Sequence, residues 1–246
     1  MNEPEYSAEF YSAVAESADQ SAEIVVPLIL DLVKAKRVAD VGCGSGAWLR
    51  KFQEHGCEIQ GFDGPWVKEE QLLIPRANFT RTDLASFSHS GNGFDLVISL
   101  EVAEHLPSSS SDQFVRALTT MAPAVVFSAA IPGQGGDFHM NEQWQSYWIA
   151  KFAHHRYECY DVLRPKLWND DRVAVHYVQN VFLFVRAEYI TQMDGGLARY
   201  GIDQRLTDVV HPRVFRDKTS PLNYSIKKFI FVFLPAYIRY LFRGKR

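Results

Sequence analysis

The sequence has few cysteines and no long apolar run. These two absences argue against a disulfide-rich protein, a cysteine-bound metal centre and a membrane-spanning protein. Its three cysteines, Cys43, Cys57 and Cys159, are an odd number, and their spacing fits neither a disulfide framework nor a metal cage. The apolar stretch 229–242 is shorter than the roughly 20 residues that span a bilayer. The acidic start of the chain lacks the apolar core of a signal peptide. We therefore expect a cytoplasmic protein.

The chain also has little net charge. Charged residues make up an ordinary 22% of it, but the net charge is only −3, so we expect no nucleic acid as a partner. No internal repeat or low-complexity run occurs. At 246 residues the chain is long enough for one sizeable α/β domain with appendages.

Apolar runs alternate with segments of helical spacing along the first three quarters of the chain. The expected strands are 37–41, 58–62, 78–83, 94–100, 124–129, 157–163 and 178–185. The expected helices are 9–18, 22–33, 47–55, 111–121 and 141–155. This alternation predicts a doubly wound, Rossmann-like sheet, whose ligands bind beyond the carboxyl ends of the strands.

A glycine-rich turn follows the first of these strands. Gly42, Gly44 and Gly46 stand at alternate positions between strand 37–41 and helix 47–55. Glycine there lets the backbone turn tightly and approach a ligand, which is typical of nucleotide and nucleoside cofactors. The spacing Gly42-x-Gly44-x-x-Ala47 also satisfies the dinucleotide fingerprint, so the glycines alone leave the cofactor open.

The carboxylate of Asp40, two residues before the first glycine, favours one cofactor. A pyrophosphate at this turn would meet like charge, whereas S-adenosylmethionine carries an ammonium and a sulfonium. The pattern Asp40-x-Gly42-x-Gly44-x-Gly46 resembles motif I of the class I S-adenosylmethionine-dependent methyltransferases. That resemblance implies a seven-stranded sheet whose last strand is antiparallel, S-adenosylmethionine as cofactor and S-adenosylhomocysteine as product.

Acidic residues follow the later strands as well. Asp63 comes about twenty residues after the glycine turn, where an acid can accept both ribose hydroxyls of either cofactor. The resemblance places Asp83 and Leu84 at the adenine, although Asp83 could equally cap the next turn. The segment Glu101-Val-Ala-Glu-His-Leu106 resembles the one after the fourth strand of ubiquinone-pathway O-methyltransferases and implies a lining for the methionine end at Glu101.

The same segment raises the question of a metal. Glu101, Glu104 and His105 are suitable ligands for a divalent cation. Such residues more often orient a loop and cap a helix, and we expect no bound metal.

A second glycine-rich loop, 131–136, precedes His139 and Glu142. His139 is the first candidate for a general base because the ordinary pKa of histidine lies near working pH. It could equally hydrogen-bond a helix start, with Glu142 in a capping role. We name His139, His105 and Glu142 as the catalytic candidates, acting on an acceptor held in line with the sulfonium methyl group.

Aromatic and amide side chains are dense downstream, namely Trp144, Tyr147, Trp148, Trp168, His176, Tyr177, Gln179 and Asn180. Such groups suit a polar ring such as a sugar, although the aromatic rings could also be core. The segments resemble methyltransferases of bacterial surface-polysaccharide and natural-product clusters, which implies O-methylation of a sugar, glycan or related small molecule. The methylated atom stays open among hydroxyl, amine and carboxylate.

We expect a methyltransferase domain over residues 1–190 and a C-terminal extension over 191–246, irregular through residue 224. Aromatic residues with basic flanks in Lys227–Arg246 suit a helix at the inner face of an anionic membrane, or one packed on the body or on a second copy. Homo-oligomerisation is left open.

Two other functions compete with this interpretation. The first is an NAD-dependent oxidoreductase or epimerase, against which Asp40 and the absence of a Tyr-x-x-x-Lys pair argue. The second is a non-catalytic protein that keeps the Rossmann-like fold as a binding scaffold.

Overall fold

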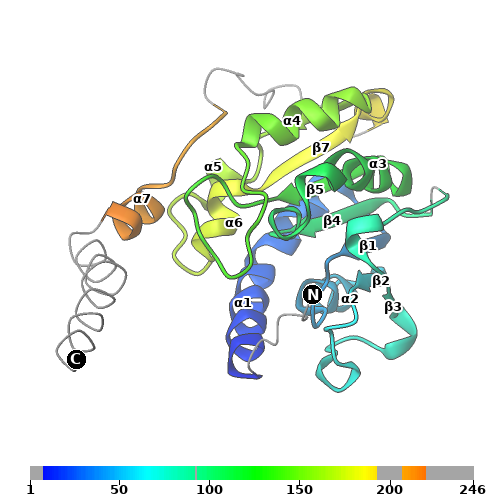
Figure 1. Ribbon diagram of the computed structural model, residues 1–246. Coiled ribbons are helices and arrows are strands. Elements are labelled where there is room, and N and C mark those ends of the chain that lie inside the picture. Colours follow the sequence, from blue (N-terminus) through cyan, green and yellow to red (C-terminus); the bar gives the residue numbers. More distant parts are fainter. Residues whose placement is uncertain (1–7, 92, 193–206, 220–246) are drawn as a thin grey trace, which may run out of the picture. The chain divides into compact units, whose positions relative to one another are not determined.

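The computed structural model describes residues 8–91, 93–192 and 207–219 (Figure 1). The chain divides into two compact units, Met1–Val209 and Val210–Arg246. The first unit contains the sheet and every residue discussed below as part of the site. The second is described only through its helix α7, Pro212–Thr219.

The first unit is built on one seven-stranded sheet. Its strands are β1 Arg37–Val41, β2 Glu58–Asp63, β3 Phe79–Arg81, β4 Leu96–Leu100, β5 Ala124–Ser128, β6 Tyr157–Tyr160 and β7 Phe182–Arg186. They lie in the order β3-β2-β1-β4-β5-β7-β6. The pairs β1–β2, β2–β3, β1–β4 and β4–β5 are parallel, whereas β7 is antiparallel to both of its neighbours. The predicted doubly wound sheet with an antiparallel last strand is confirmed.

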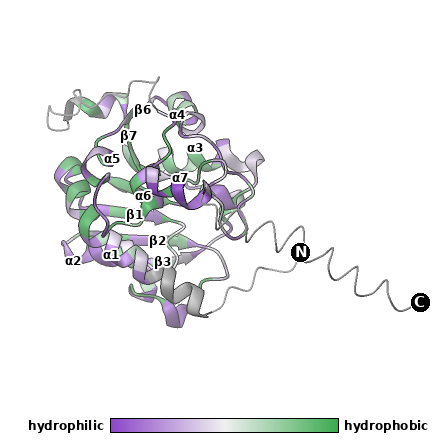
Figure 2. Cartoon of the chain, turned by 90° about the vertical axis from the view of Figure 1, so that its left-hand side faces the viewer, coloured by the Kyte–Doolittle hydropathy of each residue, from purple (hydrophilic) through white to green (hydrophobic). Residues whose placement is uncertain are grey.

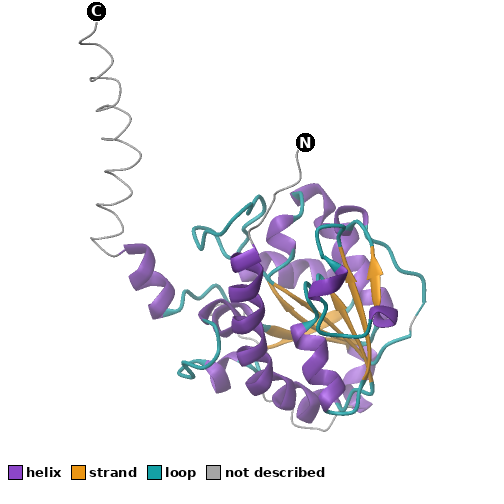
Figure 3. Ribbon diagram, turned by 90° about the horizontal axis from the view of Figure 1, so that it is seen from below, coloured by secondary structure: helices purple, strands orange, loops and turns teal. Residues whose placement is uncertain are grey.

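Helices cover both faces of this sheet, as the view from below shows (Figure 3). The longer ones are α1 Ala8–Val33, α2 Ala47–Glu54, α3 Ser111–Met121 and α4 Gln145–His154, and the short ones are α5 Arg164–Leu167 and α6 Val175–Asn180. Apolar side chains of α1, α2 and α6 share one core cluster, and those of α3 and α4 share another. The sheet is therefore the middle of three layers.

Side-chain alternation along the strands explains the two clusters. In β4, Leu96 and Ile98 join the cluster of α1 and α2, whereas Val97 joins that of α3 and α4. Because both faces are covered, all five residues of β4 and of β5 are buried. Figure 2 shows the resulting concentration of hydrophobic residues in the central strands.

The N-terminal part differs from the expectation of two helices, because residues 8–33 form the single helix α1. No glycine or proline separates the two expected segments, and Ser21 between them donates a 2.8 Å hydrogen bond to the Ser17 carbonyl four residues earlier. Pro27 lies inside the helix and does not end it. The two apolar patterns therefore belong to one continuous helix.

The expected strand 178–185 is wrong in its first part. Residues 175–180 form the helix α6, and the strand β7 begins only at Phe182. Val178 and Val181 made an extended segment plausible from sequence. The helix buries Tyr177 and Val178 in the core and places the buried amides of Gln179 and Asn180 among polar partners, which outweighs the preference of valine for strands.

Other boundaries shift by smaller amounts. The helix expected from residue 141 begins at Gln145, and the strand expected to residue 163 ends at Tyr160. The segment expected to be irregular through residue 224 contains α7. Lys227–Arg246 lies outside the described residues. Within the described part of the chain, no helix is long and apolar enough to span a membrane.

Strand order locates the candidate site. The chain runs outward from β1 to β2 and β3, then returns to place β4 on the other side of β1. This reversal is a topological switch point, and in open α/β sheets ligands bind there, beyond the carboxyl ends of the strands. Asp40 lies near the end of β1, and Glu101 follows β4 directly.

Candidate active site

The glycine turn after β1 has the backbone geometry that its sequence predicts. Gly42, Gly44 and Gly46 have φ angles of 91°, 52° and 84°, in the left-handed region that favours glycine. A Cβ on Gly42 would collide with Val102, which follows β4, whereas a Cβ on Gly44 would meet nothing within 4 Å. Gly42 is therefore required for packing, and Gly44 faces open space.

Asp63, at the end of β2, hydrogen-bonds to this turn. Its carboxylate accepts hydrogen bonds of 2.6 Å from the backbone N–H groups of Gly44 and Gly64. The Trp66 side chain also hydrogen-bonds to it. Burial raises the pKa of Asp63 to about 6, although these three hydrogen bonds oppose the rise. The carboxylate thus links the glycine turn after β1 to the loop after β2.

Asp40 is buried beside the turn, at 3% exposure. Among the described residues, we find no hydrogen bond or ion pair to its carboxylate. Burial, and then the neighbouring Asp63, raise the pKa of Asp40 well above its ordinary range. A buried carboxylate without a partner is costly, so this position is suited to a cationic ligand that would favour the charged form.

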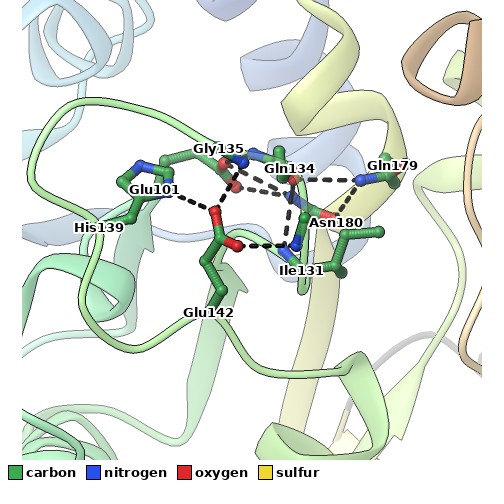
Figure 4. A network of polar contacts seen from close by, with 9 residues as sticks. Glu101, Ile131, Gln134, Gly135, His139, Glu142, Gln179 and Asn180 are labelled. Carbon is green, nitrogen blue, oxygen red and sulfur yellow. Dashed lines mark hydrogen bonds and ion pairs between the residues drawn. The ribbon is translucent and has the colours of Figure 1, made fainter. Parts of the chain in front are cut away.

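Glu101 lies at the centre of a polar network after β4 (Figure 4). Its carboxylate accepts hydrogen bonds from Gln134 at 2.9 Å and from Asn180 at 3.1 Å. Asn180 and Gln179 both donate to the Gln134 side-chain oxygen, at 2.9 and 3.1 Å. The Glu101 backbone is left-handed, with φ of 55°, and its N–H donates to Ser128 of β5. The network joins the loops after β4 and β5 to α6.

His139 and Glu142 form a pair in the loop after β5 (Figure 4). Nδ1 of His139 lies 2.9 Å from Oε1 of Glu142. The same carboxylate accepts hydrogen bonds from the backbone N–H groups of Gly133 and Gly135, at 2.8 and 2.6 Å. Burial raises the pKa of Glu142, but the hydrogen bonds from His139 and the two glycines lower it overall. Glu142 therefore holds both the loop and the histidine ring.

His105 and Glu104 meet this loop from the short 3-10 helix Ala103–His105 after β4. The rings of His105 and His139 meet edge to face, with centroids 4.8 Å apart. Burial, and then His139, lower the pKa of His105 to about 4. The backbone carbonyl of Glu104 accepts hydrogen bonds from the N–H groups of Met140 and Asn141. All three catalytic candidates, His105, His139 and Glu142, are thus brought to one place.

A comparison with protein families identifies the fold's relatives. The family model described as "Methyltransferase domain" matches residues 16–166, more than half of the chain. The chain belongs to this methyltransferase family. The predicted class of enzyme, class I S-adenosylmethionine-dependent methyltransferase, and its cofactor are thereby confirmed.

Curated relatives of this methyltransferase include ubiquinone biosynthesis O-methyltransferases. The one from Hahella chejuensis is 28% identical over 113 residues, which cover 39% of this chain and 46% of that protein. The one from Coxiella burnetii is 29% identical over 84 residues, covering 30% and 35%. The methyltransferase chain thus spans less than half the length of the curated relatives that it matches.

Two solved structures share the fold of the methyltransferase. An O-methyltransferase family protein from Burkholderia thailandensis has a TM-score of 0.52 at 13% identity, covering 72% of this chain and 58% of that one. CalS10, an amino pentose methyltransferase from Micromonospora echinaspora with S-adenosylmethionine bound, has a TM-score of 0.51 at 17% identity, covering 76% and 100%. At such identities the likeness shows the fold alone.

The structure separates the two interpretations of Asp83. This exposed residue begins the 3-10 helix Leu84–Ser86, and its carboxylate accepts hydrogen bonds from the Ala85 N–H and the Ser86 hydroxyl, at 3.0 and 2.8 Å. Capping is therefore what Asp83 does in the folded methyltransferase. Leu84 is buried in the core. Their contact with adenine stays a prediction.

Several aromatic residues that suited a sugar site are core residues. Trp148 packs on Phe127, and Tyr177 packs edge to face on Trp48, both with less than 10% exposure. Gln179 and Asn180 bind Gln134 and Glu101 instead of facing solvent. Trp144 is exposed at 41%, beside the exposed Phe138 and Met140 of the same loop. The loop after β5 therefore presents exposed apolar side chains next to His139 in the chain.

Sequence reasoning missed Trp66, Gln134 and Asn141 as site residues. Trp66 contacts Asp63 through a loop conformation that carries no sequence signal. Asn141 is buried and donates to the Ala103 carbonyl and the Ser111 hydroxyl, which anchors the loop after β5. Only Gln134 had a usable signal, because it interrupts the glycine-rich loop with an amide.

Proposed function

We propose that this methyltransferase transfers the methyl group of S-adenosylmethionine to a hydroxyl of a small-molecule acceptor. The observation that carries the proposal is the carboxylate of Asp40, which is buried beside the glycine turn and has no hydrogen-bond or ion-pair partner in the described part of the chain. The ammonium of S-adenosylmethionine would supply the missing positive charge. A pyrophosphate would add a third negatively charged group near Asp40 and Asp63.

The carboxylates of Asp40 and Asp63 are assigned to different parts of the cofactor. Asp40 is assigned to the methionine ammonium, and Asp63 to the ribose hydroxyls. Gly44, which has open space where a Cβ would stand, allows the backbone to approach the cofactor. Glu101, fixed by Gln134 and Asn180, is assigned to the methionine end.

Methyl transfer to a hydroxyl is an in-line displacement. The O–H bond is broken, the oxygen attacks the sulfonium methyl carbon, and the electron pair of the C–S bond returns to sulfur, which leaves S-adenosylhomocysteine. His139 is the group assigned to the hydroxyl proton, since Glu142 fixes its Nδ1 and leaves Nε2 for the acceptor. His105 lies against His139, and Glu142 acts as a positioning residue.

For the acceptor we propose a sugar, glycan or related hydroxylated compound. The loop 131–144 supports this proposal because it carries exposed apolar groups, Phe138, Met140 and Trp144, beside the polar His139. Such a combination can pack on the apolar face of a sugar ring while a polar group reaches its hydroxyl.

Calorimetry and an acceptor screen test the proposal. S-adenosylmethionine should bind and NAD should not. Absence of heat with S-adenosylmethionine would sink the proposal, and heat with NAD would favour an oxidoreductase. Formation of S-adenosylhomocysteine is then followed with free sugars, nucleotide sugars, catechols, amines and carboxylates. Turnover confined to amines or carboxylates would contradict O-methylation, and cofactor binding without turnover would favour a non-catalytic protein.

We further propose that the methyltransferase works at the inner face of a membrane through Lys227–Arg246. Support comes only from the aromatic and basic composition of that segment. The full chain should float with anionic vesicles at low salt, and a chain that ends at residue 226 should not. Equal flotation of the two proteins would contradict this proposal.

A further inference from the structure

Glu104, His105 and His139 form a cluster that cofactor binding leaves unexplained. One potential ligand atom from each of the three lies within 4.8 Å of the others. Two of these residues come from the turn after β4 and the third from the loop after β5. We propose that the three side chains bind one divalent transition-metal ion, and that this ion binds the acceptor's hydroxyl oxygen.

The carboxylate of Glu104 is the strongest evidence for the site. Its side chain is fully buried, and among the described residues no side chain hydrogen-bonds to either oxygen; only the backbone N–H groups of Glu104 itself and Ala130 approach the carboxylate. An acidic side chain in this state is costly, because it has lost its water and has no positively charged partner among the described residues. Buried carboxylates are normally paired or bound to a metal ion. The two imidazole rings beside it make the second explanation the better one.

Both histidines are oriented as metal-bound histidines usually are. A ligating histidine typically gives its other ring nitrogen to a carboxylate or a backbone carbonyl. Nδ1 of His139 contacts Glu142, and the ring of His105 hydrogen-bonds with the backbone of Phe138. Each ring therefore keeps one nitrogen for a ligand. Glu142 is itself held by Gly133 and Gly135, so the supporting layer is rigid.

The donor set selects the kind of ion. Two imidazoles and one carboxylate suit Zn²⁺, Fe²⁺, Co²⁺ or Mn²⁺, whereas Mg²⁺ and Ca²⁺ prefer oxygen ligands alone. Three protein ligands also leave coordination positions open. In catalytic sites those positions take water or substrate.

An ion in this position would activate the acceptor directly. A hydroxyl bound to a divalent cation loses its proton more readily, and the proton passes to solvent water. The resulting oxygen attacks the methyl carbon, and sulfur takes the electron pair of the broken C–S bond. Two open positions would also bind two neighbouring oxygens, so the preferred acceptors are vicinal diols, as found in many sugars and in catechols.

This inference rests on the proposed function and changes one assignment within it. The lone pair at Nε2 of His139 cannot hold both a proton and a metal ion. With the ion bound, His139 acts on the hydroxyl through the ion and does not take the proton itself. It also revises our expectation from sequence that no metal is bound.

Cobalt binding to the full chain tests the site without cofactor or acceptor. Protein stripped with a chelator is titrated with Co²⁺, and the visible absorption of the bound ion is recorded. We expect one Co²⁺ per chain, displaced by Zn²⁺ and not by Mg²⁺. Glu142→Gln should weaken binding about 10- to 100-fold, and Glu104→Gln by at least as much. His154→Ala, which removes an exposed histidine at the end of α4, is the matched control and should bind Co²⁺ as the wild type does.

The outcomes separate this inference from the proposed function. Failure of the wild type to bind Co²⁺, or equal binding by folded Glu104→Gln, overturns the metal site even if S-adenosylmethionine binds. Loss of binding in His154→Ala overturns it as well. Folding of each variant is checked by circular dichroism and by retained heat of S-adenosylmethionine binding. Where Co²⁺ binds as expected, chelation should stop formation of S-adenosylhomocysteine and one equivalent of Zn²⁺, Mn²⁺ or Co²⁺ should restore it. Unchanged turnover after chelation overturns the catalytic role.

Discussion

The carboxylate of Asp63 accepts a 2.6 Å hydrogen bond from the backbone N–H of Gly44, nineteen residues earlier in the chain. This bond joins the end of β2 to the glycine turn after β1. It fixes the turn beside the switch point, where Asp40 is buried and has no partner within residues 8–91, 93–192 and 207–219. We therefore expect changes at these two strand ends to alter both cofactor affinity and folding stability, and to alter how each depends on pH.

Replacement of Asp40 by asparagine should weaken S-adenosylmethionine binding and leave the fold intact. The change removes a charge-assisted interaction with the ammonium, worth about 1.5–3 kcal/mol, or roughly 10- to 150-fold in dissociation constant. Calorimetry measures it. Glu188→Gln is the control, because it removes one exposed carboxylate, paired with Arg156. Equal affinity of Asp40→Asn and wild type would remove Asp40 from the cofactor site.

Cofactor affinity should fall as the pH is lowered through about 6. That is the pKa of Asp63 in the protein without ligand, and ribose hydroxyls donate better to the ionised carboxylate. Below this pH the affinity should fall by up to about tenfold per pH unit. Calorimetry between about pH 5 and pH 8, roughly one to two units on either side of this pKa, gives the slope of affinity against pH. A flat profile in the wild type would contradict the assignment.

The same pKa predicts a stability change of opposite direction. Because the folded pKa of Asp63 is raised from 3.8, the folded chain binds more protons than the unfolded chain between about pH 4 and pH 6. The free energy of unfolding without cofactor should therefore fall as the pH rises through this window. Urea denaturation measures it. Asp63→Asn should make the profile flatter, and an unchanged slope in this variant would assign the effect to other groups.

Alanine at Gly42 and at Gly44 should have different consequences. At Gly42 a left-handed φ and a collision with Val102 combine, which should cost roughly 2–5 kcal/mol of stability. At Gly44 the Cβ meets no atom, so the stability cost should be limited to about 1–2 kcal/mol from backbone conformation. Gly44→Ala should nevertheless bind S-adenosylmethionine more weakly. Thermal unfolding and calorimetry together separate the two effects, and normal cofactor binding by Gly44→Ala would show that the open space is not the cofactor's.

Gly136→Ala should displace His139 while sparing the cofactor. A Cβ on Gly136 would collide with Nε2 of His139, and Gly136 is in an exposed loop. Formation of S-adenosylhomocysteine should fall by at least about tenfold, in the range that a positioned catalytic group contributes. S-adenosylmethionine binding should not change. Gly93→Ala is the matched control, since its Cβ would meet no atom within 4 Å and its backbone does not require glycine. Unchanged turnover in Gly136→Ala would remove His139 from the reaction.

The fold class, the family and the cofactor could all be predicted from the amino-acid sequence. These depend on local patterns, namely buried strands, the glycine turn and one carboxylate two residues before it. A left-handed turn requires glycine, and a cationic cofactor favours a nearby carboxylate. Both requirements fall on consecutive residues, so a short stretch of sequence shows them. The helix Ser111–Met121 and the strand Arg37–Val41 were predicted with their observed bounds for the same reason.

The way in which the loops meet depends on contacts that exist only in the folded chain. Residues 175–180 have valines that favour a strand, but core packing of Tyr177 and the partners of Asn180 make a helix. Likewise, no sequence spacing shows that His139 lies against His105, or that the Glu104 carboxylate is buried with no side-chain partner among the described residues. These relations depend on contacts between segments that parallel strands carry to the same edge of the sheet. The glycine turn therefore identified the methyl donor from sequence, whereas the groups facing the acceptor emerged only from the fold.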